Sequence, residues 1–233
     1  MSDPVLLITG ASSGIGAATA RAAAHGHRLV LAARREEELA ALAEELGGPE
    51  RALAVPCDVT EWDQVQALAA AALDGFGRID AVFANAGFGA TRGFLEESPE
   101  HWKSMVLTNV YGAALTIRAT LPHILERGDG HFLITSSIAG RRALPGSLYS
   151  ATKFAETAMG ESLRQELRQM HENHGIRVTL IEPGMVDTPF FDNSPGDYAL
   201  KDDDIARAVM YALEQPPSVD VNEILIRPTT QPL

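Results

Sequence analysis

Short apolar runs alternate with longer amphipathic stretches along this chain. Runs rich in Val, Ile, Leu and Ala indicate strands that are buried on both faces. The predicted strands are residues 5–8, 28–33, 51–55, 79–84, 131–135, 176–181 and 223–226. Apolar residues recurring every three or four positions indicate helices between them. The predicted helices run from a glycine-rich turn to about residue 25, then over 36–46, 62–73 capped by Thr60, 99–127 with a break near Pro122, 147–174 closed by Gly175, and 201–214.

This alternation of strand and helix is typical of parallel sheets built from right-handed crossovers. The sequence therefore predicts an α/β fold, a Rossmann-type, doubly wound, seven-stranded parallel sheet with helices on both faces. Pro216 and Pro217 make the strongest break, but they lie between the last helix and the last strand. We therefore expect one domain over residues 1–233, with a short lid at about 185–200.

Composition and charge narrow the classes of partner. The 233 residues carry a formal net charge of −12, so broad binding to nucleic acid or to an anionic membrane is not expected. No apolar run approaches the roughly 20 residues of a membrane span, and the first residues lack the basic region of a signal peptide. Cys57 is the single cysteine, which excludes an internal disulfide and fits a reducing compartment, so we expect a cytoplasmic protein.

A glycine-rich turn, residues 9–16 (TGASSGIG), follows the first predicted strand and opens the first helix. Gly10 permits the tight turn, Gly14 lets the backbone approach a pyrophosphate, and Gly16 allows close packing of helix and sheet. The helix N-terminus offers N–H groups to an anion. An isolated glycine-rich turn is often only a turn, but the strand–turn–helix context favours dinucleotide binding. The expected contacts are Gly10, Ser12, Ser13, Gly14, Ile15 and Gly16.

Two arginines, Arg34 and Arg35, stand at the end of the second predicted strand, where an NAD site usually places an acid. Arginine pairs with phosphate in fork geometry, so the pair favours the 2′-phosphate of NADP(H). The alternative is that both are solvated residues before a helix. Cations are disfavoured at a helix N-terminus, which argues for a function.

Polar and small residues follow the third and fourth strands. The Asp58 carboxylate can accept the adenine amino group, with Val59 beside it, or it can cap the next helix. Residues 85–87, Asn85, Ala86 and Gly87, can let a cofactor cross the strand ends or form a structural turn, and both can hold.

Tyr149 and Lys153 are spaced i, i+4, on one face of the long helix after the fifth strand. A phenol has a reference pKa of about 10, and a neighbouring ammonium favours the phenolate. The pair is therefore a candidate general acid/base. Taken alone, this spacing is common and mostly structural, so its context decides.

The motifs together resemble the short-chain dehydrogenase/reductase family, in its compact single-domain form. They occur in the family's order over nearly the whole chain, and they are the glycine-rich turn, Asp58, residues 85–87, Asn109, residues 137–140 (SIAG), Tyr149 with Lys153, and Pro183-Gly184 with Thr188. The resemblance implies an NADP(H)-dependent alcohol dehydrogenase or carbonyl reductase, in which the cofactor carries the hydride and no metal is needed.

The resemblance also implies residue roles. Tyr149 would exchange a proton with the carbonyl or alcohol oxygen, Ser137 would hydrogen-bond that oxygen, and Lys153 would bind the nicotinamide ribose and lower the pKa of Tyr149. Asn109 would anchor a water that relays protons towards Lys153. The nicotinamide would be bracketed by Pro183, Gly184, Val186 and Thr188.

The catalytic serine has two candidates. The spacing from Ser137 to Tyr149 is one residue shorter than is common in the family, and Ser136 would restore it. The Ser-x-Ala-Gly pattern favours Ser137, with a deletion in the loop that follows.

Aromatic and basic residues near the predicted lid bear on the substrate. Phe190, Phe191 and Tyr198 in the lid, with Phe88, Phe94 and Leu144, suggest an apolar wall for a small carbonyl or alcohol. Arg141 and Arg142 can attract an acidic substrate, although a solvated loop is the simpler interpretation. The C-terminal residues 222–229 resemble family members that act on 3-hydroxy acids and related small alcohols. The family usually forms homotetramers, or dimers, through its two long helices.

Two other classes of protein are alternatives to this interpretation. A non-catalytic NADP-binding regulator or structural subunit would be expected to lack Tyr149, Lys153 or the serine, and all three are present. A sugar-nucleotide epimerase of the larger related family would need a C-terminal substrate domain, for which this chain has no room.

Overall fold

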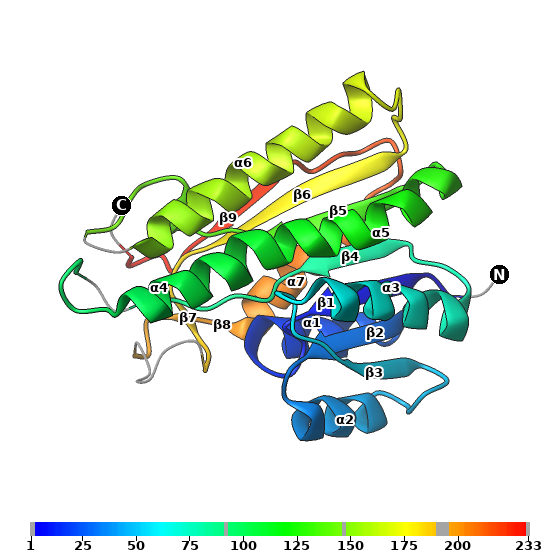
Figure 1. Ribbon diagram of the computed structural model, residues 1–233, viewed down its shortest axis with the longest axis horizontal. Helices are drawn as coiled ribbons and strands as arrows, with labels where there is room; N and C mark the ends of the chain where they lie inside the picture. Colours follow the sequence, from blue (N-terminus) through cyan, green and yellow to red (C-terminus); the bar gives the residue numbers. More distant parts are fainter. Residues whose placement is uncertain (1–2, 91–92, 146–147, 190–195, 232–233) are drawn as a thin grey trace.

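Seven strands form one parallel sheet in the order β3-β2-β1-β4-β5-β6-β9 (Figure 1). The computed structural model describes residues 3–90, 93–145, 148–189 and 196–231. The strands of this sheet are β1 (Val5–Thr9), β2 (Arg28–Ala33), β3 (Ala52–Pro56), β4 (Ala81–Ala84), β5 (Gly130–Thr135), β6 (Ile176–Pro183) and β9 (Glu223–Ile226). A separate parallel pair joins β7 (Val186–Asp187) to β8 (Leu200–Lys201). The predicted seven-stranded Rossmann-type sheet is confirmed.

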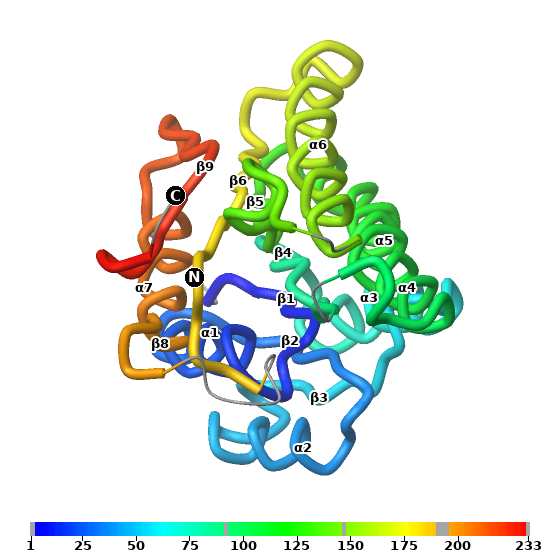
Figure 2. Tube along the Cα trace, turned by 90° about the vertical axis from the view of Figure 1, so that its left-hand side faces the viewer, coloured from blue at the N-terminus to red at the C-terminus, as the bar shows by residue number. Residues whose placement is uncertain are grey.

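Helices cover both faces of the sheet (Figure 2). One face carries α3 (Trp62–Phe76), α5 (Ala113–Arg127) and α6 (Leu148–Gln169), and the other carries α1 (Gly14–Ala23), α2 (Glu36–Glu45) and α7 (Asp202–Leu213). Successive strand residues point to opposite faces. Leu7 and Val30 therefore pack in the first layer, whereas Leu6 and Leu29 pack in the second, and all four are buried. The two cores explain why the inner strands are largely apolar, whereas the edge strands β3 and β9 are partly exposed.

The strand order reverses between β1 and β4. From β1 the chain runs outward through β2 to β3, and it then returns to place β4 on the other side of β1. The loops leaving β1 and β4 therefore diverge, and in open α/β sheets such a point opens a crevice at the carboxyl ends of the strands. The candidate site lies at this edge.

The predicted long helix over 99–127 is wrong in its detail. It consists of α4 (Pro99–Val106), a π-helix η1 (Leu107–Gly112) and α5. Pro122 lies inside α5 without ending it, and the irregularity falls around Asn109 instead. A π-helix widens one turn of the ladder and often marks a functional position.

Two predicted helix ends are also corrected. The helix α6 ends at Gln169, because Asn173 turns its side chain to the N–H groups of Gly175 and Ile176 instead of continuing the helix. Gly175 is needed for close approach, since a Cβ there would lie 2.4 Å from the carbonyl oxygen of Gly128. The cap of α3 is Glu61 rather than Thr60.

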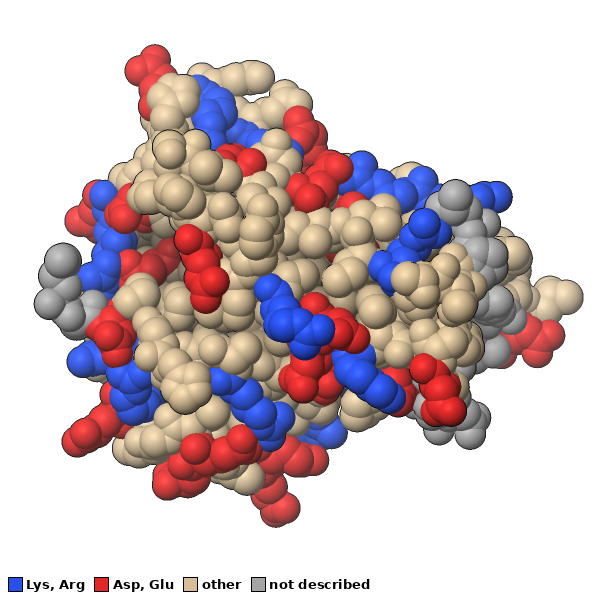
Figure 3. All heavy atoms as spheres, turned by 180° about the vertical axis from the view of Figure 1, so that it is seen from behind, with Lys and Arg blue, Asp and Glu red and all other residues tan. Residues whose placement is uncertain are grey.

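Charges are mixed on the surface. Figure 3 shows acidic and basic side chains interspersed over the face opposite to that of Figure 1, so positive charge is not gathered into one broad area there. Among the helices in the described ranges, none combines the length and apolarity that crossing a membrane requires.

Candidate active site

A cavity of about 740 Å³ opens at the carboxyl edge of the sheet. This volume falls in the roughly 300–1,000 Å³ range of small-molecule sites. Its lining includes most of the residues singled out from the sequence, namely Gly10, Ser12, Ser13, Gly14, Ile15, Arg34, Arg35, Asp58, Val59, Asn85, Ala86, Gly87, Ser136, Ser137, Tyr149, Lys153, Pro183, Gly184, Val186 and Thr188. Gly16 and Asn109 are not among the lining residues.

The glycine-rich turn is shaped by close backbone approach. Gly10 has a φ of +68°, and a Cβ there would lie 2.9 Å from the Cα of Ala86. A Cβ on Gly16 would lie 2.3 Å from the carbonyl oxygen of Gly10, which explains why Gly16 packs behind the turn and not in the cavity. Ser13 precedes α1 and makes no side-chain capping bond. The first N–H groups of α1 can therefore receive a phosphate, as a dinucleotide site requires.

The two arginines after β2 differ in their contacts. Arg35 donates to Ser12 Oγ at 3.0 Å and to Ser13 Oγ at 2.5 Å, so its guanidinium lies against the glycine-rich turn. In the part of the chain that the structure describes, the Arg34 guanidinium makes no hydrogen bond or ion pair. Both line the cavity beside the turn. This corner therefore presents positive charge where the sequence lacks the usual acid.

Asp58 shapes the loop after β3. Its Oδ1 accepts hydrogen bonds from the N–H of Thr60, at 2.9 Å, and from Thr60 Oγ1, at 2.8 Å. Thr60 is thus engaged by Asp58, which is why it does not cap α3. Asp58 also lines the cavity, next to Val59.

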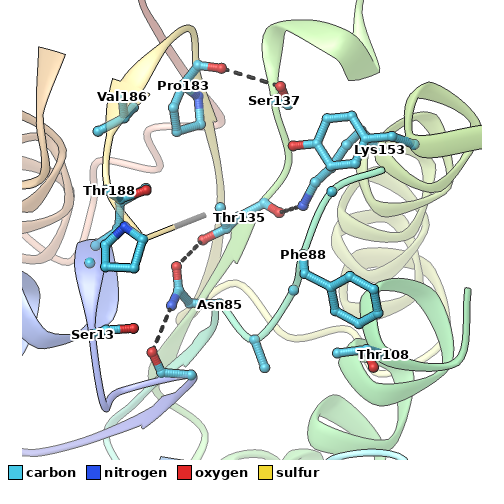
Figure 4. A pocket seen from close by; sticks show the side chains of 18 of the residues that line it. Ser13, Asn85, Phe88, Thr108, Thr135, Ser137, Lys153, Pro183, Val186 and Thr188 are labelled. Atoms are coloured by element: carbon cyan, nitrogen blue, oxygen red, sulfur yellow. Dashed lines mark hydrogen bonds between the residues drawn. The ribbon is translucent and has the colours of Figure 1, made fainter. Parts of the chain in front are cut away.

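Asn85 ties together the ends of three strands. Its N–H donates to Thr9 Oγ1 at 3.0 Å, and its side-chain nitrogen donates to the Thr9 carbonyl at 3.2 Å. Its side-chain oxygen accepts from Thr135 Oγ1 at 3.0 Å (Figure 4). These bonds join β1, β4 and β5 at the floor of the cavity, so Asn85 has a structural role.

The two adjacent serines point in different directions. Ser136 Oγ donates to the Lys153 carbonyl at 2.9 Å and lies 2.7 Å from Thr157 Oγ1, so it is bonded to α6. Ser137 Oγ donates to the Pro183 carbonyl at 3.3 Å, across the cavity rim in Figure 4. The Ser137 side chain also hydrogen-bonds Tyr149.

Tyr149 and Lys153 lie together at the start of α6. Lys153 Nζ is 5.6 Å from the centroid of the Tyr149 ring and donates to the Thr135 carbonyl at 2.9 Å (Figure 4). Burial raises the pKa of the Tyr149 phenol, whereas the Lys153 charge and the Ser137 hydrogen bond lower it. The net direction is upward, so the lowering expected from Lys153 exists but is outweighed by burial and by Glu156.

Glu156 is a site residue that the sequence reasoning missed. It is 2% exposed, and its Oε2 lies 2.8 Å from Lys153 Nζ. Burial raises the pKa of its carboxyl to about 7, against the opposing effect of Lys153. Burial lowers the pKa of Lys153, but Glu156 and Tyr149 outweigh it and leave that pKa above its usual value. An acid three residues after Lys153, on the same helix face, was the available signal.

Asn109 sits in the π-helix η1, fully buried behind the cavity wall. Its Oδ1 accepts from the Phe88 N–H at 3.0 Å, and its Nδ2 donates to the Phe88 carbonyl at 2.9 Å. Nδ2 also donates to Thr152 Oγ1 at 3.1 Å, which links η1 to α6. A Cβ on Gly87 would lie 3.1 Å from Asn109 Oδ1. The side chain therefore positions the loop after β4.

Arg141 lies in an exposed loop, but its guanidinium is engaged in ion pairs and is not a free anchor for substrate. It pairs with Glu182 at 2.6 Å and also with Glu223. Glu182 is 1% exposed, so Arg141 offsets a buried carboxylate at the end of β6.

The expected apolar wall is found only in part. Phe88 and Leu144 line the cavity, whereas Phe94 is exposed and packs edge-on against Trp102. Tyr198 is half exposed and not part of the lining. The lid at 185–200 is described at its two ends, and Phe190 and Phe191 lie outside the described residues. Met185, at the start of the predicted lid, lines the cavity, and further lining residues missed from the sequence are Gly89, Ala90, His101, Ser104 and Gln231.

Comparison with known proteins identifies the family of this chain. A family model described as short chain dehydrogenase matches residues 4–199. The chain belongs to the short-chain dehydrogenase family. An uncharacterized oxidoreductase of Staphylococcus saprophyticus, a member of similar length, is 39% identical over 245 residues, covering 99% of this chain and 98% of that protein.

Solved short-chain dehydrogenases have the same fold. An alcohol dehydrogenase of the archaeon Thermococcus sibiricus, complexed with 5-hydroxy-NADP, matches with a TM-score of 0.87 at 34% identity, over 100% of this chain and 99% of that chain. A short chain dehydrogenase/reductase of Burkholderia phymatum in complex with NAD matches with a TM-score of 0.84 at 30% identity, over 96% and 89%. The chain is therefore an oxidoreductase of this family, and its neighbours include complexes with either nucleotide.

Proposed function

We propose that this protein transfers hydride between NADP(H) and a small carbonyl or alcohol, with Tyr149 as the general acid/base. The observation that carries the proposal is the cluster of Ser137, Tyr149 and Lys153 at the wall of one cavity whose opposite end is the glycine-rich turn. A phosphate-binding end and a proton-donating end in one cavity suit a dinucleotide-dependent reaction.

Several contacts support cofactor binding at the glycine-rich turn. The pyrophosphate would lie against the N-terminus of α1. At Gly14, the first residue of α1, a Cβ would lie 3.3 Å from the Thr188 side chain, so a glycine keeps this point open. The Asp58 carboxylate would accept the adenine amino group. The nicotinamide would lie among the residues that follow β6, namely Pro183, Gly184, Val186 and Thr188.

The preference for NADP(H) rests on Arg34 and Arg35. Arg34 is free to pair with a 2′-phosphate, and Arg35 is held beside the same corner by Ser12 and Ser13. Ala33, the last residue of β2, supplies no carboxylate for the ribose hydroxyls that NAD would present.

Each residue of the site would have a separate role in the reaction. Bound NADPH would supply the hydride. The Tyr149 hydroxyl would donate its proton to the carbonyl oxygen, or the phenolate would remove the proton of an alcohol in the reverse direction. Ser137 would hydrogen-bond the same oxygen, while Ser136 remains bonded to α6. Lys153 would hold the nicotinamide ribose, and the π-helix around Asn109 would anchor a water that returns protons towards Lys153.

Assembly and location follow from the surface and the composition. Apolar side chains exposed along α4, η1 and α6 support a homotetramer, or a dimer, formed through these helices, and they are Val106, Leu107, Tyr111 and Phe154. Cys57 is buried and unpaired, which fits a cytoplasmic protein.

The test is NADPH oxidation, followed by absorbance, with a panel of aldehydes, ketones and 3-keto acids and with NADH in parallel. We expect turnover of at least one carbonyl compound with NADPH, and slower turnover with NADH. A protein that binds NADPH but oxidises it with no member of the panel would instead support a non-catalytic NADP-binding function.

A further inference from the structure

The carboxylate of Glu156 forms a buried ion pair with Lys153, the residue that contacts the acid/base candidate Tyr149. Oε2 lies 2.8 Å from Nζ, and Oε1 accepts a hydrogen bond from Nζ at 3.1 Å. The Lys153 and Glu156 side chains are 5% and 3% exposed. Charges this deeply enclosed are weakly screened by solvent, so each strongly affects the other and their neighbours.

The contacts of Lys153 leave little freedom for its ammonium. One contact goes to the Thr135 carbonyl at 2.9 Å, another to Glu156, and the Tyr149 ring lies on a third side. Glu156 therefore fixes the position of the ammonium and neutralises part of its charge. Less positive charge is left to stabilise a Tyr149 phenolate, and Glu156 itself raises the pKa of Tyr149.

We propose that Glu156 is a positioning residue that anchors the Lys153 ammonium and offsets its charge, so that Tyr149 keeps its proton to higher pH. This inference rests on the proposed function, in which Tyr149 donates that proton. It gives the site a direction: proton donation to a carbonyl remains available in alkaline conditions, whereas proton removal from an alcohol is delayed to higher pH.

Other charged groups do not supply the same effect. Among the described residues, Lys153 is the charged group that acts on the pKa of Glu156, and Glu156 and Tyr149 are those that act on the pKa of Lys153. On the described parts of the elements packed against α6, three titratable groups have other partners. His101 on α4 contacts the Gly89 carbonyl, His131 on β5 contacts Thr179, and Glu182 on β6 pairs with Arg141 after η2 (Ile138–Gly140).

The charge state of Glu156 suits this role. Its pKa of about 7 lies below the range in which the Tyr149 phenol titrates. Glu156 is therefore ionised wherever Tyr149 loses its proton. Replacing Glu156 by glutamine removes the negative charge, keeps the size and a hydrogen-bond acceptor, and makes the phenolate easier to form.

The direct test is ¹³C NMR of protein labelled at the tyrosine Cζ, titrated with pH without cofactor. Comparison with Tyr149→Phe assigns the Tyr149 signal. We expect Glu156→Gln to lower the Tyr149 midpoint by about one pH unit or more, the usual scale for a close buried charge. The matched control is Glu161→Gln, an exposed glutamate of the same helix that pairs with Arg164, which leaves the midpoint in place.

Activity provides a second readout. In Glu156→Gln, the alkaline fall in kcat/KM for carbonyl reduction moves to lower pH, and alcohol oxidation begins at lower pH. If circular dichroism shows that Glu156→Gln does not fold, Glu156→Met serves in its place, with the same shift expected.

An unchanged or raised Tyr149 midpoint would overturn the inference, and a raised one would mean that Glu156 acts chiefly by keeping Lys153 charged. Failure of the proposed function is separate, because it appears as turnover that survives in Tyr149→Phe, whatever the NMR midpoint does.

Discussion

Lys153 on α6 donates a 2.9 Å hydrogen bond to the carbonyl oxygen of Thr135, the last residue of β5. The Thr135 side chain in turn donates to Asn85, which is bonded to Thr9 of β1. The position of the Lys153 ammonium is therefore fixed by hydrogen bonds to the edge of the sheet. Such support from secondary structure is what a precise catalytic position requires.

This arrangement predicts that the shape of Lys153 matters as well as its charge. Lys153→Met should lower kcat/KM by about 10²–10⁴-fold, the scale of general acid/base catalysis. Lys153→Arg should not restore activity, because a planar guanidinium cannot take the place of a compact ammonium between Thr135 and Glu156. Steady-state kinetics measures both, with Lys103→Met, an exposed lysine of α4, as the control. Near wild-type activity in Lys153→Arg would contradict the geometric argument.

Arg34 should determine the choice of nucleotide. Removing a charge-assisted contact to a 2′-phosphate costs about 1.5–3 kcal/mol, or about 10–150-fold in affinity. Arg34→Ala should therefore raise the Kd for NADPH by that factor while the Kd for NADH changes little. Titration calorimetry measures the two constants, and Arg207→Ala on α7 is the control. Equal loss for both nucleotides would remove the 2′-phosphate interpretation.

The two serines should separate activity from stability. Ser137→Ala removes the hydroxyl that faces the cavity, and loss of such a donor costs about 10²–10³-fold in kcat. Ser136→Ala removes bonds to Lys153 and Thr157 in α6, so it should lower the free energy of unfolding by about 1 kcal/mol and keep most of the activity. Kinetics and urea unfolding of both variants distinguish them. The reverse pattern would identify Ser136 as the catalytic serine.

His131 should make the protein less stable in acid. Burial between strands lowers the pKa of its imidazole to about 3, with Nε2 against Thr179 Oγ1. Below pH 6.5 the unfolded chain binds a proton that the folded protein does not, so stability falls as the pH falls. At pH 5 this costs about 2 kcal/mol. Urea unfolding measures the fall in the free energy of unfolding from pH 7 to pH 5. This fall should be smaller in His131→Gln than in the wild type by about 2 kcal/mol.

The control for that measurement is His174→Gln, because His174 is exposed. It should keep the wild-type difference between pH 7 and pH 5. If His131→Gln showed the same difference as the wild type, burial of a neutral imidazole would not be the cause.

The sheet could be predicted from the sequence because its inner strands, such as β1, are apolar on both faces. Leu6 and Leu7 pack into the cores on opposite faces of the sheet. A continuous apolar run such as β1 therefore indicates a strand that is buried in a parallel sheet. The residues after each strand could be placed in one site for the same reason, since all carboxyl ends of parallel strands meet at one edge. The order of motifs then brought Ser137, Tyr149 and Lys153 together.

Other features of the structure depend on contacts between residues that are distant in sequence, and the hydrophobic periodicity does not predict such contacts. Asn109, in the π-helix, is bonded through its side chain to Phe88 and Thr152, which are distant in sequence. The end of α6 depends on Asn173, which leaves the helix to bind the N–H groups ahead of β6. Glu156 was hidden in an amphipathic pattern, because a charge on a helix normally indicates the solvated face.

The most direct measurement is the rate of NADPH-dependent carbonyl reduction by Tyr149→Phe, with the Kd for NADPH measured on the same protein. The matched control is Tyr211→Phe, an exposed tyrosine of α7. If Tyr149 donates the proton, Tyr149→Phe should lose at least about 10²-fold in kcat while the Kd for NADPH stays close to wild type, and Tyr211→Phe should keep full activity. Full activity in Tyr149→Phe would contradict the account.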